Sequence, residues 1–242
     1  MAPVEDRRPS LDRPAVSRHA AALAGPLGAS CDLSGYRLAG GTALAWALGH
    51  RRSDDLDFFT RVPGFLHPIE QDRIASVLRQ LDTTARIDVS QPQTIHAVVR
   101  DCKVSFFGLG GRWLSDAVQL TEGFGLATTE EIAAMKLIAV STRSARKDFF
   151  DLHALASRGH SAEAMFSSLR SMYPNEIDVD VGLHVARALT DFSDAELDPD
   201  PVLLERVTWS EAKRSAQHLA SDLQRYLRDL QRSGFGRRSV PD

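Results

Sequence analysis

The stretch Leu38–Thr60, LAGGTALAWALGHRRSDDLDFFT, decides the expected fold of this 242-residue chain. It predicts a strand, a tight glycine turn, a short helix, a basic loop and a second strand. Asp55 and Asp57 lie two residues apart on that second strand, so their side chains point to the same face. Neighbouring carboxylates repel each other unless a cation lies between them. We expect Mg²⁺ (or Mn²⁺) there, because hard cations prefer oxygen ligands and accompany phosphates.

The turn at Gly40, Gly41 and Thr42 offers a place for phosphates. Glycine lets the backbone approach an anion closely, and the first N–H groups of a helix are unsatisfied. In the basic loop, Arg51 is a candidate nucleotide contact, because a guanidinium matches phosphate geometry; the alternative is a solvated turn. Ser53 either contacts the nucleotide or braces the loop. An anion cradle beside a metal-binding carboxylate pair indicates phosphoryl or nucleotidyl transfer.

The composition argues against a strongly basic nucleic-acid-binding protein, a disulfide scaffold and a membrane protein. Hydrophobic residues make up 43% and charged residues 25% of the chain, and the formal net charge is −3. Any contact with nucleic acid must therefore come from a local basic patch. Cys31 and Cys102 are the only cysteines, which argues against a disulfide scaffold and fits a reducing compartment. No run of sequence resembles a membrane span or a signal peptide, so we expect a cytoplasmic protein without membrane contact.

Hydrophobic periodicity predicts an α+β fold, with a mixed sheet of about five strands, flanking helices and a C-terminal helical domain. We place the α/β domain at residues 1–125 and the helical domain at 126–242. The expected strands are 36–39, the Asp-bearing segment, 84–89, 94–99 and 102–107. The expected helices are 14–24, 42–48, 68–81, 129–143, the segment after Lys147, 162–172, 179–192 and 209–230.

Two blocks of sequence resemble a known family. GGTALAWALGHRRSDDLDFF at residues 40–59 and EEIAAMKLIAVSTRSARKDFFDLHAL at residues 130–155 are similar to motifs of the AbiEii/AbiGii-type toxin nucleotidyltransferases, in the DNA polymerase β-like nucleotidyltransferase superfamily. The resemblance implies the nucleotidyltransferase fold and a toxin of a toxin–antitoxin or phage-defence system. It also implies an NTP substrate, the 3′ end of tRNA as acceptor, arrest of translation and growth, and a cognate antitoxin as partner.

The second block supplies further site residues by this resemblance. In the family, a lysine in this helix approaches the nucleotide phosphates, and a basic residue followed by Asp closes the active site. The resemblance therefore implies catalytic roles for Lys136 and Asp148, and nucleotide contacts for Lys136, Arg143 and Lys147. From the residues alone, the Lys136 side chain could instead extend to solvent. Asp148 could instead lie in the first turn of a helix, where the helix dipole stabilises a negative charge. Asp151 is either a second active-site acid or a hydrogen-bonding group within the helical domain.

A third carboxylate is the feature that the pattern lacks. Superfamily members usually carry another acid on a later strand, and at that position this chain has Ser105, a neutral and weak ligand for Mg²⁺. Asp88 could serve from a neighbouring strand, or it could be a surface acid at the end of a strand. Two alternatives to nucleotidyl transfer therefore stay open: a kinase-like phosphotransferase on the same fold, and a nucleotide-binding interaction protein without turnover.

Overall fold

The computed structural model describes residues 8–60, 66–108 and 110–233. Its contacts divide the chain into two compact units, Met1–Thr129 and Glu130–Asp242, which we call the N-terminal and C-terminal units. The sequence placed this boundary slightly earlier, between residues 125 and 126.

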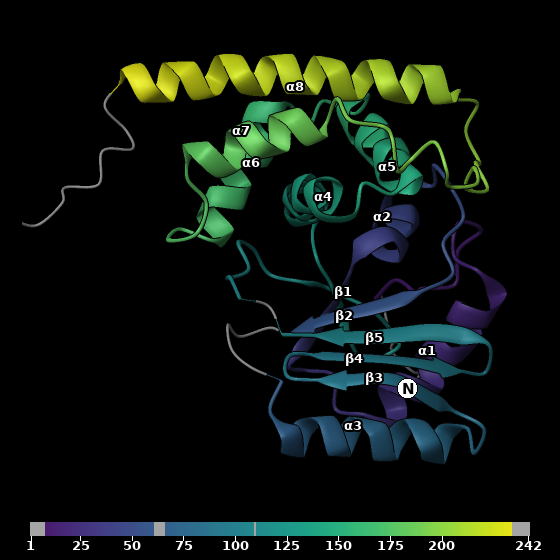
Figure 1. Cartoon of the computed structure of the whole chain (residues 1–242). Helices are drawn as coiled ribbons and strands as arrows, with labels where there is room; N and C mark the ends of the chain where they lie inside the picture. Colours follow the sequence, from purple (N-terminus) through teal and green to yellow (C-terminus); the bar gives the residue numbers. More distant parts are fainter. Residues whose placement is uncertain (1–7, 61–65, 109, 234–242) are drawn as a thin grey trace, which may run out of the picture. The chain divides into compact units, whose positions relative to one another are not determined.

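Within the described residues, the N-terminal unit holds one seven-stranded sheet with the order β3-β4-β5-β2-β1-β7-β6. Figure 1 labels the strands β1 to β5 of this sheet. Its strands are β1 (Tyr36–Ala39), β2 (Leu56–Thr60), β3 (Arg86–Gln91), β4 (Thr94–Val99), β5 (Cys102–Phe107), β6 (Val118–Gln119) and β7 (Gly125–Leu126). β2 pairs antiparallel with β1 and parallel with β5, so the sheet is mixed, as predicted. The expected count of about five strands omitted β6 and β7, because two residues are too few to show an alternation.

One face of this sheet forms the core of the N-terminal unit. Phe58, Phe106 and Ile95 lie on that face, and each is fully buried. The described part of this unit also contains the helices α1 (Arg18–Ser30), α2 (Gly40–Leu48) and α3 (Pro68–Leu81). α1 contacts α3 and β5, and α3 also contacts β3 and β4. Because side chains alternate along a strand, the opposite face carries Asp57 and Ser105.

The first helix differs from the prediction of residues 14–24. It begins at Arg18, because the side chain of Ser17 caps it by accepting from the Ala20 N–H at 3.2 Å. It also continues through Pro26 to Ser30, although proline usually ends a helix. The core-facing residues Leu23 and Leu27 are fully buried, so packing of this helix outweighs the local cost of the proline.

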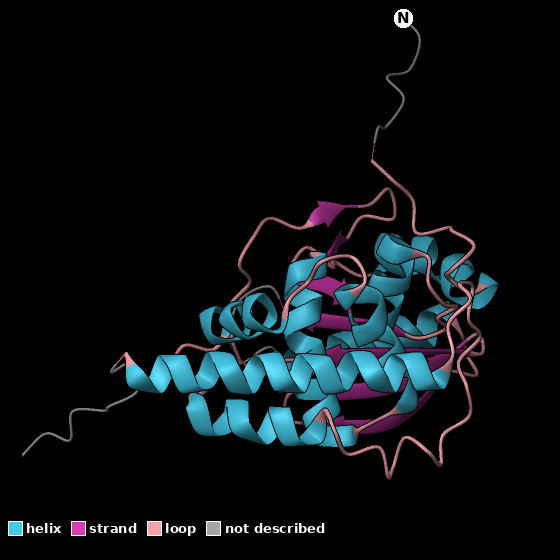
Figure 2. Cartoon of the chain, turned by 90° about the horizontal axis from the view of Figure 1, so that it is seen from above, coloured by secondary structure: helices cyan, strands magenta, loops and turns pink. Residues whose placement is uncertain are grey.

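The C-terminal unit is helical among its described residues. Its helices are α4 (Thr129–Arg143), α5 (Arg146–Ala156), α6 (Ala162–Met172), α7 (Val179–Ala188) and α8 (Trp209–Arg232). The long α8, the longest helix in Figure 2, starts with a capping box of Thr208 and Glu211. It packs against α5, α6 and α7. α7 ends at Ala188, earlier than the predicted residue 192. No helix in the described ranges combines the length and apolar character needed to cross a membrane.

Candidate functional site

The acidic pair of the N-terminal unit lies at the start of β2. Asp57 belongs to the strand, whereas Asp55 precedes it, because the ladder with β5 begins only at Leu56; the prediction that both lie within the strand was wrong by one residue. Both aspartates are half-buried. The Asp57 carboxylate lies against Gly40, where an added Cβ would be 3.0 Å from Oδ2. Gly40 also has a φ of +66°, which glycine adopts without strain. Gly40 therefore lets Asp57 lie against the start of α2.

The next glycine makes room for a buried arginine. An added Cβ at Gly41 would lie 2.6 Å from Nη2 of Arg51 and 3.2 Å from Oγ of Ser53. The Arg51 side chain is buried, and its Nη1 donates to the Arg52 carbonyl at 3.0 Å. The structure thus brings Gly41, Arg51 and Ser53 together and holds a guanidinium against the first turn of α2. A guanidinium is a group whose geometry matches phosphate oxygens.

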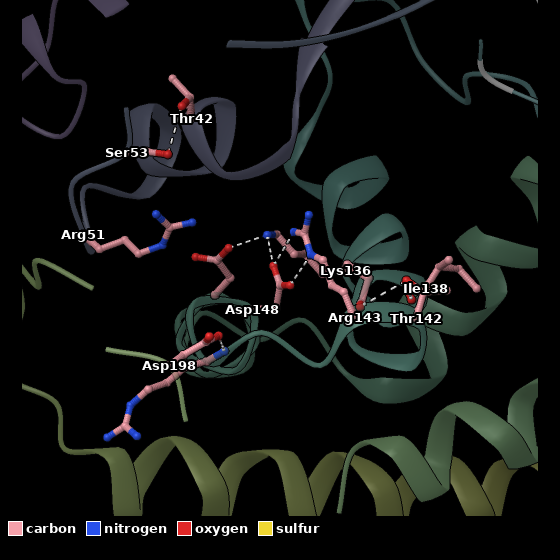
Figure 3. A network of polar contacts seen from close by, with 12 residues as sticks. Thr42, Arg51, Ser53, Lys136, Ile138, Thr142, Arg143, Asp148 and Asp198 are labelled. Atoms are coloured by element: carbon pink, nitrogen blue, oxygen red, sulfur yellow. Dashed lines mark hydrogen bonds and ion pairs between the residues drawn. The ribbon is translucent and has the colours of Figure 1, made fainter. Parts of the chain in front are cut away.

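The side chains of Thr42 and Ser53 connect α2 to the loop before β2. Their hydroxyl oxygens lie 2.9 Å apart (Figure 3). Thr42 also donates to the backbone carbonyl of Asp55. Ser53 is further fixed through its backbone, because its N–H donates to the Ala15 carbonyl and its carbonyl accepts from the Ser17 N–H, both at 2.9 Å. These contacts favour the bracing role for Ser53. Together they fix the position of Asp55.

Ser105 lies beside Asp57 in the parallel pairing of β5 with β2. Its hydroxyl is 3.1 Å from Nδ1 of His96, which stands opposite Ser105 on β4. The sequence motifs do not single out His96, although the predicted hairpin places it. The hairpin predicted from segments 94–99 and 102–107 pairs residue 96 with residue 105. At this position, next to Asp57, the chain thus has a hydroxyl held by an imidazole and no third carboxylate.

Asp88 lies far from the acidic pair within the sheet. It belongs to the edge strand β3, and β4 and β5 separate that strand from β2. Three strand spacings correspond to about 14 Å. The exposed Asp88 carboxylate lies 3.4 Å from Nε of Arg86. The structure therefore does not bring Asp88 to Asp57, and its surroundings match the surface-acid alternative.

A second cluster, in the C-terminal unit, consists of Lys136, Arg143, Asp148 and Asp151. Lys136 Nζ lies 2.6 Å from Asp148 Oδ1 and 2.5 Å from Asp151 Oδ2. Arg143 makes a two-pronged contact with Asp148, from Nε to Oδ2 at 2.7 Å and from Nη2 to Oδ1 at 2.9 Å (Figure 3). The Lys136 side chain is 2% exposed, and both aspartates are fully buried. Lys136 therefore does not extend to solvent.

The charges of this cluster balance. Two cations face two carboxylates, and the burial of an ion without a partner would be costly. Burial acts to raise the pKa of Asp148, but the charges of Lys136 and Arg143, with the hydrogen bonds from Arg143, outweigh it and lower the pKa below its ordinary value. Asp148 is thus ionised. Lys147, which precedes it on α5, is half-buried.

An acidic segment of the C-terminal unit fixes the start of α5. The N–H of Arg146 donates to Oδ2 of Asp198 at 3.0 Å, and its Nε donates to Oδ1 of Asp200 at 2.6 Å. The guanidinium of Arg146 also stacks on Trp209, 4.5 Å from the ring centroid. These contacts hold the first turn of α5, and with it Asp148, in place.

The donor atoms at Asp55 and Asp57 fit Mg²⁺ that arrives with a nucleotide. Among the described residues, no group of three or more His, Cys, Asp or Glu side chains could hold a metal ion. A zinc site, which needs three or four protein ligands, is therefore not formed by them. Mg²⁺ differs, because it commonly binds through one or two carboxylates and completes its shell with water and phosphate oxygens.

Comparisons with known proteins identify a family for the chain and a fold for its structure. Residues 118–233 match the family described as "Nucleotidyl transferase AbiEii toxin, Type IV TA system". The uncharacterized protein aq_aa25 of Aquifex aeolicus (strain VF5) is 32% identical over 164 residues, which are 66% of this chain and 75% of that protein. The structure resembles MenT4, the nucleotidyltransferase toxin Rv2826c of Mycobacterium tuberculosis H37Rv, with a TM-score of 0.52 and 16% identity.

The likeness to MenT4 covers 88% of this chain and 90% of that one, and at this identity it shows the fold. It confirms the predicted nucleotidyltransferase-type α+β fold. The family match contains all four residues of the buried cluster, and the first motif, Gly40 to Phe59, lies outside it. On the family match and the Aquifex relative, the chain belongs to the AbiEii family of nucleotidyltransferase toxins of type IV toxin–antitoxin systems.

Proposed function

We propose that the chain transfers a nucleoside monophosphate from an NTP to the 3′-terminal hydroxyl of a tRNA, with Mg²⁺ held by Asp55 and Asp57. The observation that carries the proposal is the arrangement of the N-terminal unit. Asp57 lies against Gly40, and the buried Arg51 lies against Gly41, so carboxylates and a cation meet at the start of α2. The family supplies the reaction class and implies an antitoxin partner.

The chain's own residues have separate tasks in this proposal. Arg51 offsets phosphate charge at the glycine turn, and Thr42 and Ser53 keep the Asp55 loop in position. The acceptor hydroxyl releases its proton to water as its oxygen forms a bond to the α-phosphorus, the bond from the α-phosphorus to the bridging oxygen breaks, and pyrophosphate leaves. Bound Mg²⁺ would neutralise phosphate charge and orient the triphosphate. Catalysis then consists mainly of positioning and charge stabilisation.

We propose that the buried cluster serves the same reaction. Asp148 and Asp151 hold the ammonium group of Lys136 at a fixed point. Arg143 differs from Lys136, because 53% of its side chain is exposed while it still contacts Asp148. Arg143 and Lys147 would contact the phosphates, and Asp148 would fix the orientation of Arg143.

The test is a labelling assay with each α-³²P-labelled NTP, deacylated tRNA and MgCl₂. We expect label on the tRNA, dependent on Mg²⁺. Asp57→Asn should reduce the transfer by about 10²- to 10³-fold, as expected for the loss of a charge-stabilising group. Asp88→Asn is the matched control, because it removes a carboxylate from the same sheet, and it should retain activity.

Other outcomes would contradict the proposal. Label from a γ-³²P-labelled NTP, on tRNA or on protein, would indicate a phosphotransferase. Binding of an NTP without any product, across metals and acceptors, would indicate a protein without turnover, and Ser105 in place of a carboxylate is the feature that favours this second candidate. Equal activity of Asp57→Asn and the wild type would remove the acidic pair from the reaction.

A further inference from the structure

The N-terminal unit contains a cavity of about 700 Å³ that the proposed nucleotide site does not use. Three arginines and a histidine line it: Arg13, Arg18, His19 and Arg52. All four are exposed. Two carboxylates, Asp12 and Asp54, also line it, so its formal charge is +1 with neutral histidine and +2 with protonated histidine. A positively charged cavity in a chain of net charge −3 is the kind of local patch that binds polyanions.

Backbone contacts hold the two sides of this cavity together. Val16 and Ser53 form a parallel bridge, in which Ser53 donates to Ala15 and accepts from Ser17. Arg52 directly precedes Ser53, so the bridge fixes Arg52 beside the chain segment that carries Arg13 and Arg18. The cavity is therefore a built feature of the fold.

Two adjacent arginines point to different surroundings. Arg51 is buried against Gly41, where the triphosphate is proposed to bind. Arg52 is exposed and lines the cavity. Since three residues span at most about 10 Å, Arg52 lies close to Asp55 along the chain. One short loop thus offers cations to two neighbouring places, and the second is open for a ligand other than the NTP.

The arginines of the cavity have charge available for such a ligand. Neither Arg18 nor Arg52 forms an ion pair through its side chain with any residue in the described ranges. Arg13 lies 4.0 Å above the ring centroid of Trp46 and donates to the Trp46 carbonyl at 3.4 Å. Stacking of this kind fixes a guanidinium but keeps its charge. The volume exceeds the space that a single phosphate needs and suits a longer chain of phosphates.

We propose that this cavity binds the phosphate backbone of the acceptor nucleic acid and guides its 3′ end toward Asp55 and Asp57. This inference rests on the proposed function and assigns it an acceptor subsite distinct from the nucleotide site. Arg18 and Arg52 contact phosphates, and Arg13 extends the positive surface. Recognition through phosphates carries no base sequence, so it would suit acceptors that share only a backbone.

The experiment measures binding of fluorescein-labelled deacylated tRNA by anisotropy between 50 and 300 mM NaCl, in about the range where such contacts respond to salt. The proteins with and without the cavity substitutions all carry Asp57→Asn, so the measured binding is independent of turnover. We expect Arg18→Gln with Arg52→Gln to weaken binding about tenfold and to reduce the salt slope by about 1 per arginine. Arg79→Gln with Arg228→Gln is the matched control, because it removes the same charge from exposed positions outside the cavity.

A parallel transfer assay with active protein locates the effect. The double substitution should raise KM for tRNA and leave KM for the NTP within about twofold. Contacts that bind the substrate and the transition state equally well change KM and leave kcat unchanged. Equal tRNA affinity of the cavity variant and the control variant would overturn the proposal. A rise in KM for the NTP would overturn it too, because the cavity would then bind the nucleotide. If wild-type protein binds tRNA through these arginines but transfers nothing, the proposed function fails and this subsite stands.

Discussion

The two acidic clusters of this protein differ in how their charge is compensated. Asp55 and Asp57 are half-buried and lie beside a glycine turn in the N-terminal unit. Asp148 and Asp151 are fully buried in the C-terminal unit and lie within 2.6 Å of the same ammonium group. In the second cluster Lys136 and Arg143 are the counter-ions of the aspartates, and on the proposed function the first cluster additionally binds a metal cation and a nucleotide.

This difference separates two uses of aspartate. A fully buried ion pair fixes a geometry, and its removal leaves an uncompensated charge in the interior. A half-buried carboxylate pair keeps access to water, so it can exchange ligands during turnover. We therefore expect substitutions in the C-terminal cluster to act first on stability, and substitutions around the glycine turn to act first on nucleotide binding.

The largest effect is expected for Lys136→Met. This substitution removes the ammonium group that both buried carboxylates contact, and loss of one member of a buried ion pair costs about 3–5 kcal/mol. Urea denaturation, followed by fluorescence in a Trp46→Phe, Trp113→Phe background, measures the C-terminal unit alone, because Trp209 is then the sole tryptophan.

Lys213→Met is the matched control for this prediction. Lys213 forms an exposed ion pair with Glu196 at 2.8 Å in the same unit, so its loss should cost far less. Adding Asp151→Asn to Lys136→Met should recover part of the stability, because one uncompensated charge disappears. If Lys136→Met were no more destabilising than Lys213→Met, the buried cluster would not hold the unit together.

A smaller effect is expected for Gly41→Ala, which tests the other side of the comparison. The new methyl group would lie 2.6 Å from Nη2 of Arg51, so the guanidinium must move. We expect KM for the NTP to rise about tenfold, the value of one displaced charge-assisted contact. Gly25→Ala, at a helical site with nothing within 4 Å, should leave KM unchanged and stabilise α1 slightly. An unchanged KM for Gly41→Ala would remove Arg51 from nucleotide binding.

The sequence predicted the elements well where periodicity was long and capping residues were present. The hairpin segments 94–99 and 102–107 and the helix Ala162–Met172 have the expected bounds, since alternation and a Ser161 cap define them. β6 and β7 could not be found, because two residues show no period. α1 begins at Arg18, later than the predicted start at Pro14, because the hydroxyl of Ser17 caps the helix.

The site was predictable as a set of residue types and less so as a set of contacts. The motif indicated that Asp57 and a glycine turn belong together, and the structure places the Asp57 carboxylate against Gly40. The local sequence does not predict different burial for Arg51 and Arg52. In the structure Arg51 is buried and Arg52 is exposed, because only Arg51 fits the space at Gly41. The contact of Lys136 with both Asp148 and Asp151 joins two helices, which local spacing does not specify.

The smallest effect is expected for Ser105→Asp, which makes the N-terminal cluster more acidic. Ser105 stands beside Asp57 in the sheet, so a carboxylate at position 105 would face the proposed cation site. The concentration of Mg²⁺ needed for half-maximal activity should fall several-fold, because carboxylate oxygens are stronger ligands than a hydroxyl. Without metal the variant should be slightly less stable than the wild type, because like charges at neighbouring positions repel.

Ser105→Asn is the control for this last prediction, since asparagine has nearly the same volume as aspartate and carries no charge. It would also disturb the contact with Nδ1 of His96, so both variants share that loss. A fall in the Mg²⁺ requirement for Ser105→Asp alone would show that the cation binds within reach of this strand position. Equal requirements in the two variants would place the cation away from β5, with Asp55 and Asp57 then acting without help from the neighbouring strand.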